Sequence, residues 1–132
     1  MIRRFNEIGK DDVMTAGGKG ANLGEMTRAG LNVPQGFVVT ADAYRLFLSE
    51  NNIDGEISAL LAAAGTDEQK LFSAAEIIRA LITAGKMPDS LREAVSHNYL
   101  LLCENAGNGS LRVAVRSSAT AEDLPDASFA GQ

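Results

Sequence analysis

The sequence predicts an α+β fold in which several helices pack on a small sheet. Apolar and polar residues alternate over residues 111–116, which is the two-residue period of a strand. Phe37–Val39 consists of residues that favour strands. Between residues 40 and 102, apolar side chains recur at helical spacing. A chain of 132 residues that is 45% hydrophobic can bury one core, so we expect a single domain.

The first element that the sequence defines is a helix preceded by a glycine-rich turn. Residues 2–13 have a mixed pattern and predict neither a strand nor a helix. Leu23 and Met26 share one helical face, and Gly30 followed by Pro34 is a typical helix stop. The turn reads AGGKGAN at residues 16–22, and Lys19 projects from it. A turn at a helix N-terminus offers N–H groups and a dipole that favour an anion, although this turn lacks the Ser or Thr of a Walker A loop.

Three helices are predicted in the middle of the chain, and one more after them. Thr40 is expected to be the N-cap of the first helix and Asp54 of the second. Thr66 and Gln69 have the spacing of a capping box at the start of the third. Pro88 suits the first position of the last helix. The glycines expected to end the second and third helices are Gly65 and Gly85.

Composition excludes several classes of partner and site. The net charge is −5 and only 5% of residues are aromatic, so a nucleic-acid-binding surface is not indicated. No signal-peptide h-region and no run of about 18 apolar residues occurs, which predicts a cytoplasmic protein without a membrane partner. Cys103 has no cysteine with which to form a disulfide or a zinc site, and we expect it in the core. We expect His97, which lies off the apolar stripe of its helix, on the surface.

The predicted strand at residues 111–116 delivers Arg116 at its end. Ser117 and Ser118 follow as loop formers, in a loop with free backbone N–H groups and hydroxyls. A guanidinium beside such a loop suits a phosphate group. Acidic residues flank a proline further along this loop and are interpreted as turn formers; they are Glu122, Asp123 and Asp126.

Two stretches of the sequence carry a family resemblance. VRSSATAEDLPDASFAGQ at the end of the chain and GGKGANLGEM near its start resemble the ATP-grasp nucleotide-binding domain of phosphoenolpyruvate synthases and rifampin phosphotransferases. The intervening AGLNVPQGFVVT resembles the loop and strand of the same domain. The resemblance implies that residues 1–132 form the N-terminal lobe of that domain. It also implies that Lys19 and Arg116 contact ATP phosphates and that Gly131 belongs to the loop covering the nucleotide.

The resemblance further implies an activity that this lobe alone does not complete. In the family, a histidine on a separate domain attacks the β-phosphate of ATP, which yields AMP, and the phosphoryl group then passes to pyruvate or an antibiotic. This is a dikinase-type kinase reaction that should require Mg²⁺. The metal ligands, the phosphohistidine domain and the acceptor domain are expected outside this chain, so His97 is not given the phosphate-carrying role.

Two groups of alternatives remain open at this point. The chain could be the corresponding part of a rifampin phosphotransferase or of a pyruvate phosphate dikinase. From another class, it could be a non-catalytic, acidic regulatory or interaction module that retains the two loops. We expect the chain alone to be inactive as an enzyme.

Overall fold

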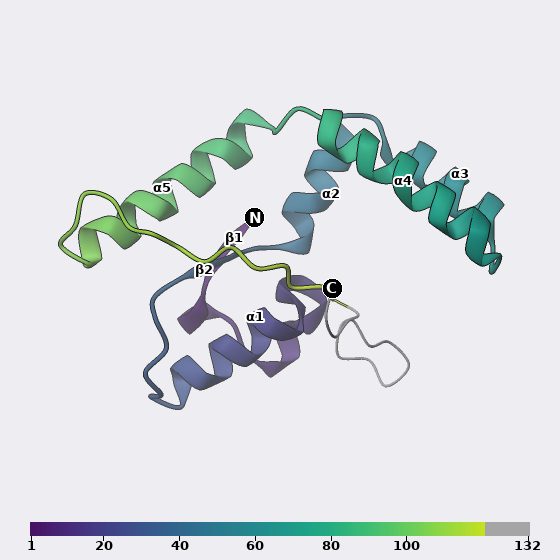
Figure 1. Cartoon of the computed structure of the whole chain (residues 1–132). Helices are drawn as coiled ribbons and strands as arrows, with labels where there is room; N and C mark the ends of the chain where they lie inside the picture. The colour runs from purple at the N-terminus through teal and green to yellow at the C-terminus, as the bar shows by residue number, and fades with distance from the viewer. Residues whose placement is uncertain (121–132) are drawn as a thin grey trace. The chain divides into compact units, whose positions relative to one another are not determined.

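The computed structural model describes residues 1–120 of the chain (Figure 1). It divides into two compact units. The first, called the α/β unit, comprises Met1–Ala43 and Ser90–Gln132, of which the structure describes the residues up to 120. The second, called the helical unit, comprises Tyr44–Asp89. Helices and a small sheet are both present, so the α+β class is as predicted.

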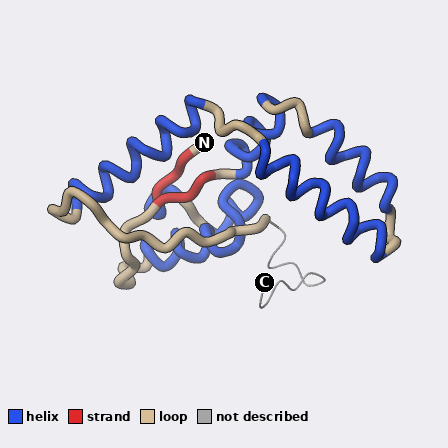
Figure 2. Tube along the Cα trace, turned by 45° about the horizontal axis from the view of Figure 1, so that its top comes forward, coloured by secondary structure: helices blue, strands red, loops and turns tan. Residues whose placement is uncertain are grey.

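The sheet of the α/β unit consists of two short antiparallel strands, shown side by side in Figure 2. β1 (Ile2–Arg4) pairs with β2 (Phe37–Val39), and Arg3 lies opposite Val38. The backbone N–H of Thr40 donates to the carbonyl of Met1 at 2.8 Å and extends the pairing by one bond. β2 confirms the predicted strand, whereas β1 lies in a stretch for which the sequence predicted nothing.

The longest element of the first half is α1 (Val13–Arg28). Two 3-10 turns, η1 (Phe5–Glu7) and η2 (Lys10–Asp12), precede it, and α1 packs against both turns and against β2. Ile8, between the two turns, is fully buried. The helix ends as predicted, because Gly30 has a φ of 75° and its N–H donates to the carbonyl of Thr27.

The last helix, α5 (Asp89–Asn105), belongs to the α/β unit from Ser90 onward. It buries Leu91 and Cys103, and His97 is exposed, as the sequence predicted for both Cys103 and His97. The Tyr99 hydroxyl donates to the carbonyl of Leu111 at 2.9 Å and accepts from its N–H at 3.2 Å. These bonds attach the chain that follows α5 to the helix.

The predicted strand at residues 111–116 is not formed. This segment is a loop in Figure 2, and Val115, expected on a buried face, is 92% exposed. A strand requires a neighbouring strand to receive its backbone hydrogen bonds. Within residues 1–120 only β1 and β2 form a ladder, so residues 111–116 have no neighbouring strand there with which to pair.

Three helices lie in sequence between the two parts of the α/β unit. The helical unit contains the second and third of them completely, and the first from Tyr44 onward. They are α2 (Ala41–Glu50), α3 (Asp54–Ala64) and α4 (Glu68–Ala84). α3 and α4 pack together and bury Ile57 and Ala74. The Asn51 side chain accepts from the N–H of Lys86 at 2.7 Å and donates to its carbonyl at 3.0 Å. It thereby fixes the residue after α2 to the chain after α4.

These helices begin within a residue or two of the predicted positions. Gly65 and Gly85 are the C-caps of α3 and α4 as predicted, but the predicted side-chain N-caps are not made. Asp54 is the first residue of α3 and Ile53 is its N-cap. At α4 the cap is Asp67, whose carboxylate accepts from the N–H groups of Gln69 and Lys70. A carboxylate one residue later therefore replaces the predicted Thr66 hydroxyl. No helix within residues 1–120 is both long enough and apolar enough to span a bilayer.

Candidate functional site

The Gly-Gly-Lys-Gly turn predicted from the sequence is a break inside α1. Gly17 has φ 72° and ψ 166°, so the helix stops after Ala16 and restarts at the next residue. A positive φ of this size is readily adopted only by glycine. A Cβ atom at Gly17 would also lie 2.2 Å from the carbonyl oxygen of Ser118. The break therefore requires glycine for its backbone angle and for the space that Ser118 occupies.

The Ser118 hydroxyl joins the two sides of this break. Its Oγ donates to the carbonyl of Ala16 at 2.8 Å and accepts from the N–H of Gly20 at 3.0 Å. The Ala16 and Gly20 backbones are buried, and Ser118 is half-buried. The serine lies 98 residues from Gly20 along the chain, so this contact connects the first motif of the sequence directly to the second.

Ala119, the next residue of the C-terminal segment (residues 111–120), contributes another hydrogen bond to this contact. We call the contact of Ser118 and Ala119 with the glycine-rich break the junction. The carbonyl of Ala119 accepts from the N–H of Gly18 at 3.3 Å. Since Gly18 and Gly20 both donate to the C-terminal segment, these two N–H groups are not available to an anion in this arrangement. The sequence predicted free N–H groups at this turn, and for these two glycines that prediction is wrong. The candidate anion contacts that remain from the sequence are the side chains of Lys19 and Arg116.

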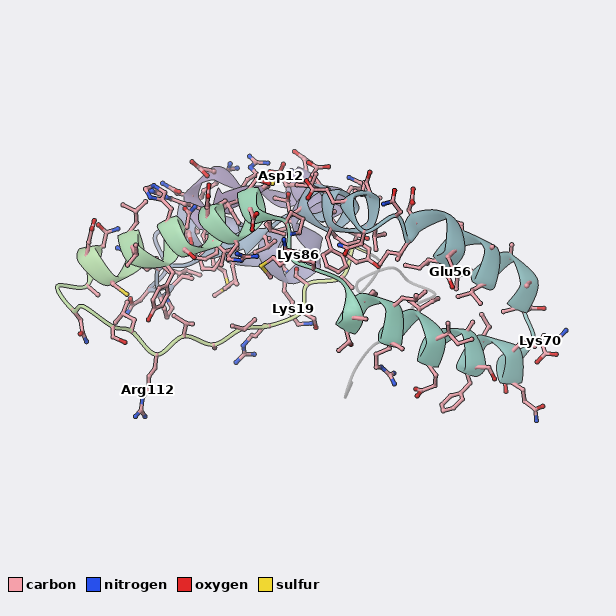
Figure 3. All side chains as sticks on the ribbon, turned by 90° about the horizontal axis from the view of Figure 1, so that it is seen from above. Asp12, Lys19, Glu56, Lys70, Lys86 and Arg112 are labelled. Atoms are coloured by element: carbon pink, nitrogen blue, oxygen red, sulfur yellow. The ribbon has the colours of Figure 1, made fainter. Side chains whose placement is uncertain are left out.

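Lys19 lies between the two bonded glycines and its side chain is exposed. The backbone after Lys19 packs closely on its neighbours, because a Cβ atom at Gly20 would lie 3.1 Å from Val38 Cγ2 and from Ala16 Cβ. The junction therefore buries the backbone on either side of Lys19 and directs the lysine outward. In Figure 3, Lys19 lies on the side of α1 along which the C-terminal segment runs.

Arg116 is exposed and lies two residues before Ser118. Two residues of chain span at most about 7 Å between Cα atoms, so the Arg116 backbone belongs to the surroundings of the junction. Arg112, earlier in the segment, points away from the helices in Figure 3. The segments that carry Lys19 and Arg116 are thus held together, while their joint contact with a phosphate stays a prediction.

Several residues singled out in the sequence do not belong to this junction or are not described. Gly131 and the acidic Glu122, Asp123 and Asp126 lie outside the described residues. Within residues 1–120 no group of three His, Cys, Asp or Glu side chains is placed to hold a metal ion.

Comparison with known proteins identifies the family. Residues 13–132 match the pyruvate phosphate dikinase AMP/ATP-binding domain. The match begins at the first residue of α1 and includes both halves of the junction around Ser118. The chain belongs to the family of this AMP/ATP-binding domain. The resemblance inferred from GGKGANLGEM and the C-terminal motif is thereby confirmed.

Several relatives of this chain are named phosphoenolpyruvate synthase or probable phosphoenolpyruvate synthase. The chain is 52% identical over 132 residues to a probable phosphoenolpyruvate synthase of Methanocaldococcus jannaschii, covering 99% of this chain and 11% of that protein. It is 46% identical over 129 residues to a probable phosphoenolpyruvate synthase of Methanothermobacter thermautotrophicus, covering 97% of this chain and 19% of the relative. It is 47% identical over 137 residues to the phosphoenolpyruvate synthase of Aquifex aeolicus, covering 100% of this chain and 16% of the relative.

The chain is therefore homologous to the N-terminal part of phosphoenolpyruvate synthases and spans about a tenth to a fifth of their length. These relatives favour the predicted synthase over the antibiotic-modifying and dikinase alternatives. Sequence reasoning found the two motifs and their cations, but it treated Ser118 as a loop former. Two sequence features could have indicated the contact of Ser118 with the break in α1. They are a small polar residue in one motif and closely spaced glycines in the other.

Proposed function

We propose that this chain forms one wall of the nucleotide site of a phosphoenolpyruvate synthase, in which Lys19 and Arg116 bind the phosphates of ATP. The observation that carries the proposal is the junction of Gly18 and Gly20 with Ser118 and Ala119. It holds together two segments that each present an exposed cation. The triphosphate carries several negative charges and requires more than one positive partner.

The reaction we propose for the whole enzyme follows from the relatives' name and from the family resemblance. ATP, pyruvate and water are converted to AMP, phosphoenolpyruvate and phosphate, through a phosphohistidine on a domain outside this chain. Catalysis at such a site consists of positioning and charge neutralisation. We assign residues 1–132 to the N-terminal lobe of an ATP-grasp domain, with Gly131 in the loop over the nucleotide. We assign the Mg²⁺ ligands to another part of the enzyme.

The test compares ATP binding by the wild-type chain, Lys19→Ala, Arg116→Ala and the control Arg112→Ala, using the initial slopes of NMR chemical-shift titrations. Arg112 is exposed, carries the same charge and lies in the same segment, but points away from the helices. Each charged hydrogen bond contributes about 1.5–3 kcal/mol. We therefore expect at least about tenfold weaker binding for each of the first two variants and a change below about twofold for the control. Equal effects for all three variants would reduce the site to non-specific charge attraction and overturn the proposal.

A further inference from the structure

The Ser118 hydroxyl makes one hydrogen bond to each side of the break in α1. A serine hydroxyl has one donor hydrogen, and here that hydrogen goes to the carbonyl of Ala16, before the break. The oxygen accepts the N–H of Gly20, after the break. The Ser118 oxygen therefore fixes the backbone on both sides of Gly17. Without these two bonds, rotation at this glycine would change the direction of the chain that follows it.

This arrangement places Lys19 inside a short anchored stretch. The residue before it donates its N–H to Ala119 and the residue after it donates to Ser118. From the bond lengths, the Cα atoms of Lys19 and Ser118 lie within about 8 Å of each other. The position of the Lys19 backbone is thus set by the same segment that carries Arg116. A polyphosphate held by both cations benefits from this, because the backbones that carry the two cations need not be ordered when it binds.

We propose that Ser118 is a positioning residue, which fixes the Lys19 backbone relative to the Arg116 segment so that both cations meet one polyphosphate. This inference rests on the proposed function. It adds that the hydroxyl acts through Lys19 and does not touch the nucleotide. It also separates Ser118 from Ser117, which is exposed and adjacent in sequence.

The difference between the two serines provides the experiment. ATP binding is measured for wild type, Ser118→Ala, Ser118→Thr and Ser117→Ala by initial titration slopes, which are proportional to the association constant when the same reporter resonances and limiting shifts are used. Loss of the two hydrogen bonds should weaken ATP binding of Ser118→Ala about five- to tenfold. Ser118→Thr, which retains the hydroxyl, should bind within about threefold of wild type, and Ser117→Ala within about twofold.

A role through Lys19 is distinguished from a merely structural one by a double-mutant cycle. If Ser118 acts by placing Lys19, then Ser118→Ala should change ATP affinity by less than about twofold in a Lys19→Ala background. A structural role would weaken binding by the same factor in both backgrounds, and that result would overturn the inference. Thermal unfolding of each variant confirms that the measurement is made on folded protein.

The two proposals fail in different ways. If the wild-type chain does not bind ATP, or if Lys19→Ala binds as wild type does, then the proposed function and this inference fall together. If Lys19→Ala weakens binding but Ser118→Ala behaves as Ser117→Ala does, the nucleotide site stands and the positioning role of Ser118 is wrong.

Discussion

The Arg3 guanidinium lies 2.7 Å from the Asp12 carboxylate and joins β1 to the turn that precedes α1. The other carboxylate oxygen of Asp12 accepts the backbone N–H of Gly9 at 2.9 Å. Arg3 also donates to the carbonyl of Glu7. The strand and both turns are thereby connected at the start of the helix that contains the Gly17 break.

These contacts make a prediction about acid. The N–H of Gly9, and next the guanidinium of Arg3, hold the pKa of Asp12 below its ordinary value of 3.8. A lowered pKa in the folded state stabilises the fold above the unfolded value, and the contribution is lost as the pH falls through the folded value. The difference in unfolding free energy between wild type and Asp12→Asn should therefore shrink below about pH 4.

Chemical denaturation at several pH values measures this difference. In an Arg3→Met background one of the two main causes of the lowered pKa is absent, so the pH dependence of the Asp12→Asn effect should become shallower. A difference that stays constant from neutral pH to pH 3 would show that these contacts do not favour the ionised carboxylate.

The helices could be predicted from the sequence because their signals are local. Apolar side chains recur at helical spacing, and glycines follow at Gly65 and Gly85, where α3 and α4 end. The caps were less accessible, because a hydroxyl and a carboxylate in neighbouring positions can both reach the free N–H groups. At α4 the carboxylate of Asp67 takes them, and the hydroxyl of Thr66 does not.

The contacts that were not predicted connect distant parts of the chain. β1 is three residues long and is defined by its bonds to β2, 35 residues later. The predicted strand at residues 111–116 failed for the opposite reason, since its alternation is local but no strand among residues 1–120 pairs with it. The contact of Ser118 with the Gly17 break spans about 100 residues, and no periodicity in either segment encodes it. The motifs gave Lys19 and Arg116 as candidates, whereas the residue that joins the two segments carrying them could be identified only from the fold.

Two helical glycines differ in the space around them and should respond oppositely to alanine. A Cβ at Gly24 of α1 would lie 2.4 Å from the carbonyl oxygen of Ile8, whereas a Cβ at Gly55 of α3 meets nothing within 4 Å. Gly24→Ala should lower the unfolding free energy by about 1–3 kcal/mol, as overpacking does. Gly55→Ala should raise it by about 0.5 kcal/mol through helix propensity. Urea unfolding checks both, and equal effects would contradict the close packing of α1 on Ile8.

Thr40 provides a second test of packing. It is 2% exposed, and its hydroxyl has no hydrogen-bond partner among the described residues. The start of α2 instead uses the Thr40 backbone carbonyl, which accepts from the N–H of Ala43 at 2.9 Å. Thr40→Val keeps the shape and removes the buried polar atom, so it should raise the unfolding free energy by about 1 kcal/mol.

The matched control at this position is Thr40→Ser, which keeps the hydroxyl and removes the methyl group. It should lower the unfolding free energy by about 1 kcal/mol, since a buried methyl is lost. Both variants are compared with wild type by thermal and urea unfolding. If the serine variant proved more stable than the valine variant, the hydroxyl would have a hydrogen-bond partner. That result would contradict the description of the Thr40 hydroxyl as buried and unpaired within residues 1–120.

The last prediction concerns how tightly this chain alone binds ATP. In the proposed site, two exposed cations supply only part of the contacts that a nucleotide needs, because Gly18 and Gly20 donate their N–H groups to the chain itself. We expect a dissociation constant of about 1 mM or weaker, which corresponds to roughly −4 kcal/mol. We also expect no AMP or phosphoenolpyruvate from ATP and pyruvate, since the proposed phosphohistidine lies outside this chain. Calorimetry that gave micromolar affinity would show that residues 1–132 contain most of the site, and formation of AMP by the chain alone would contradict the assignment to a single lobe.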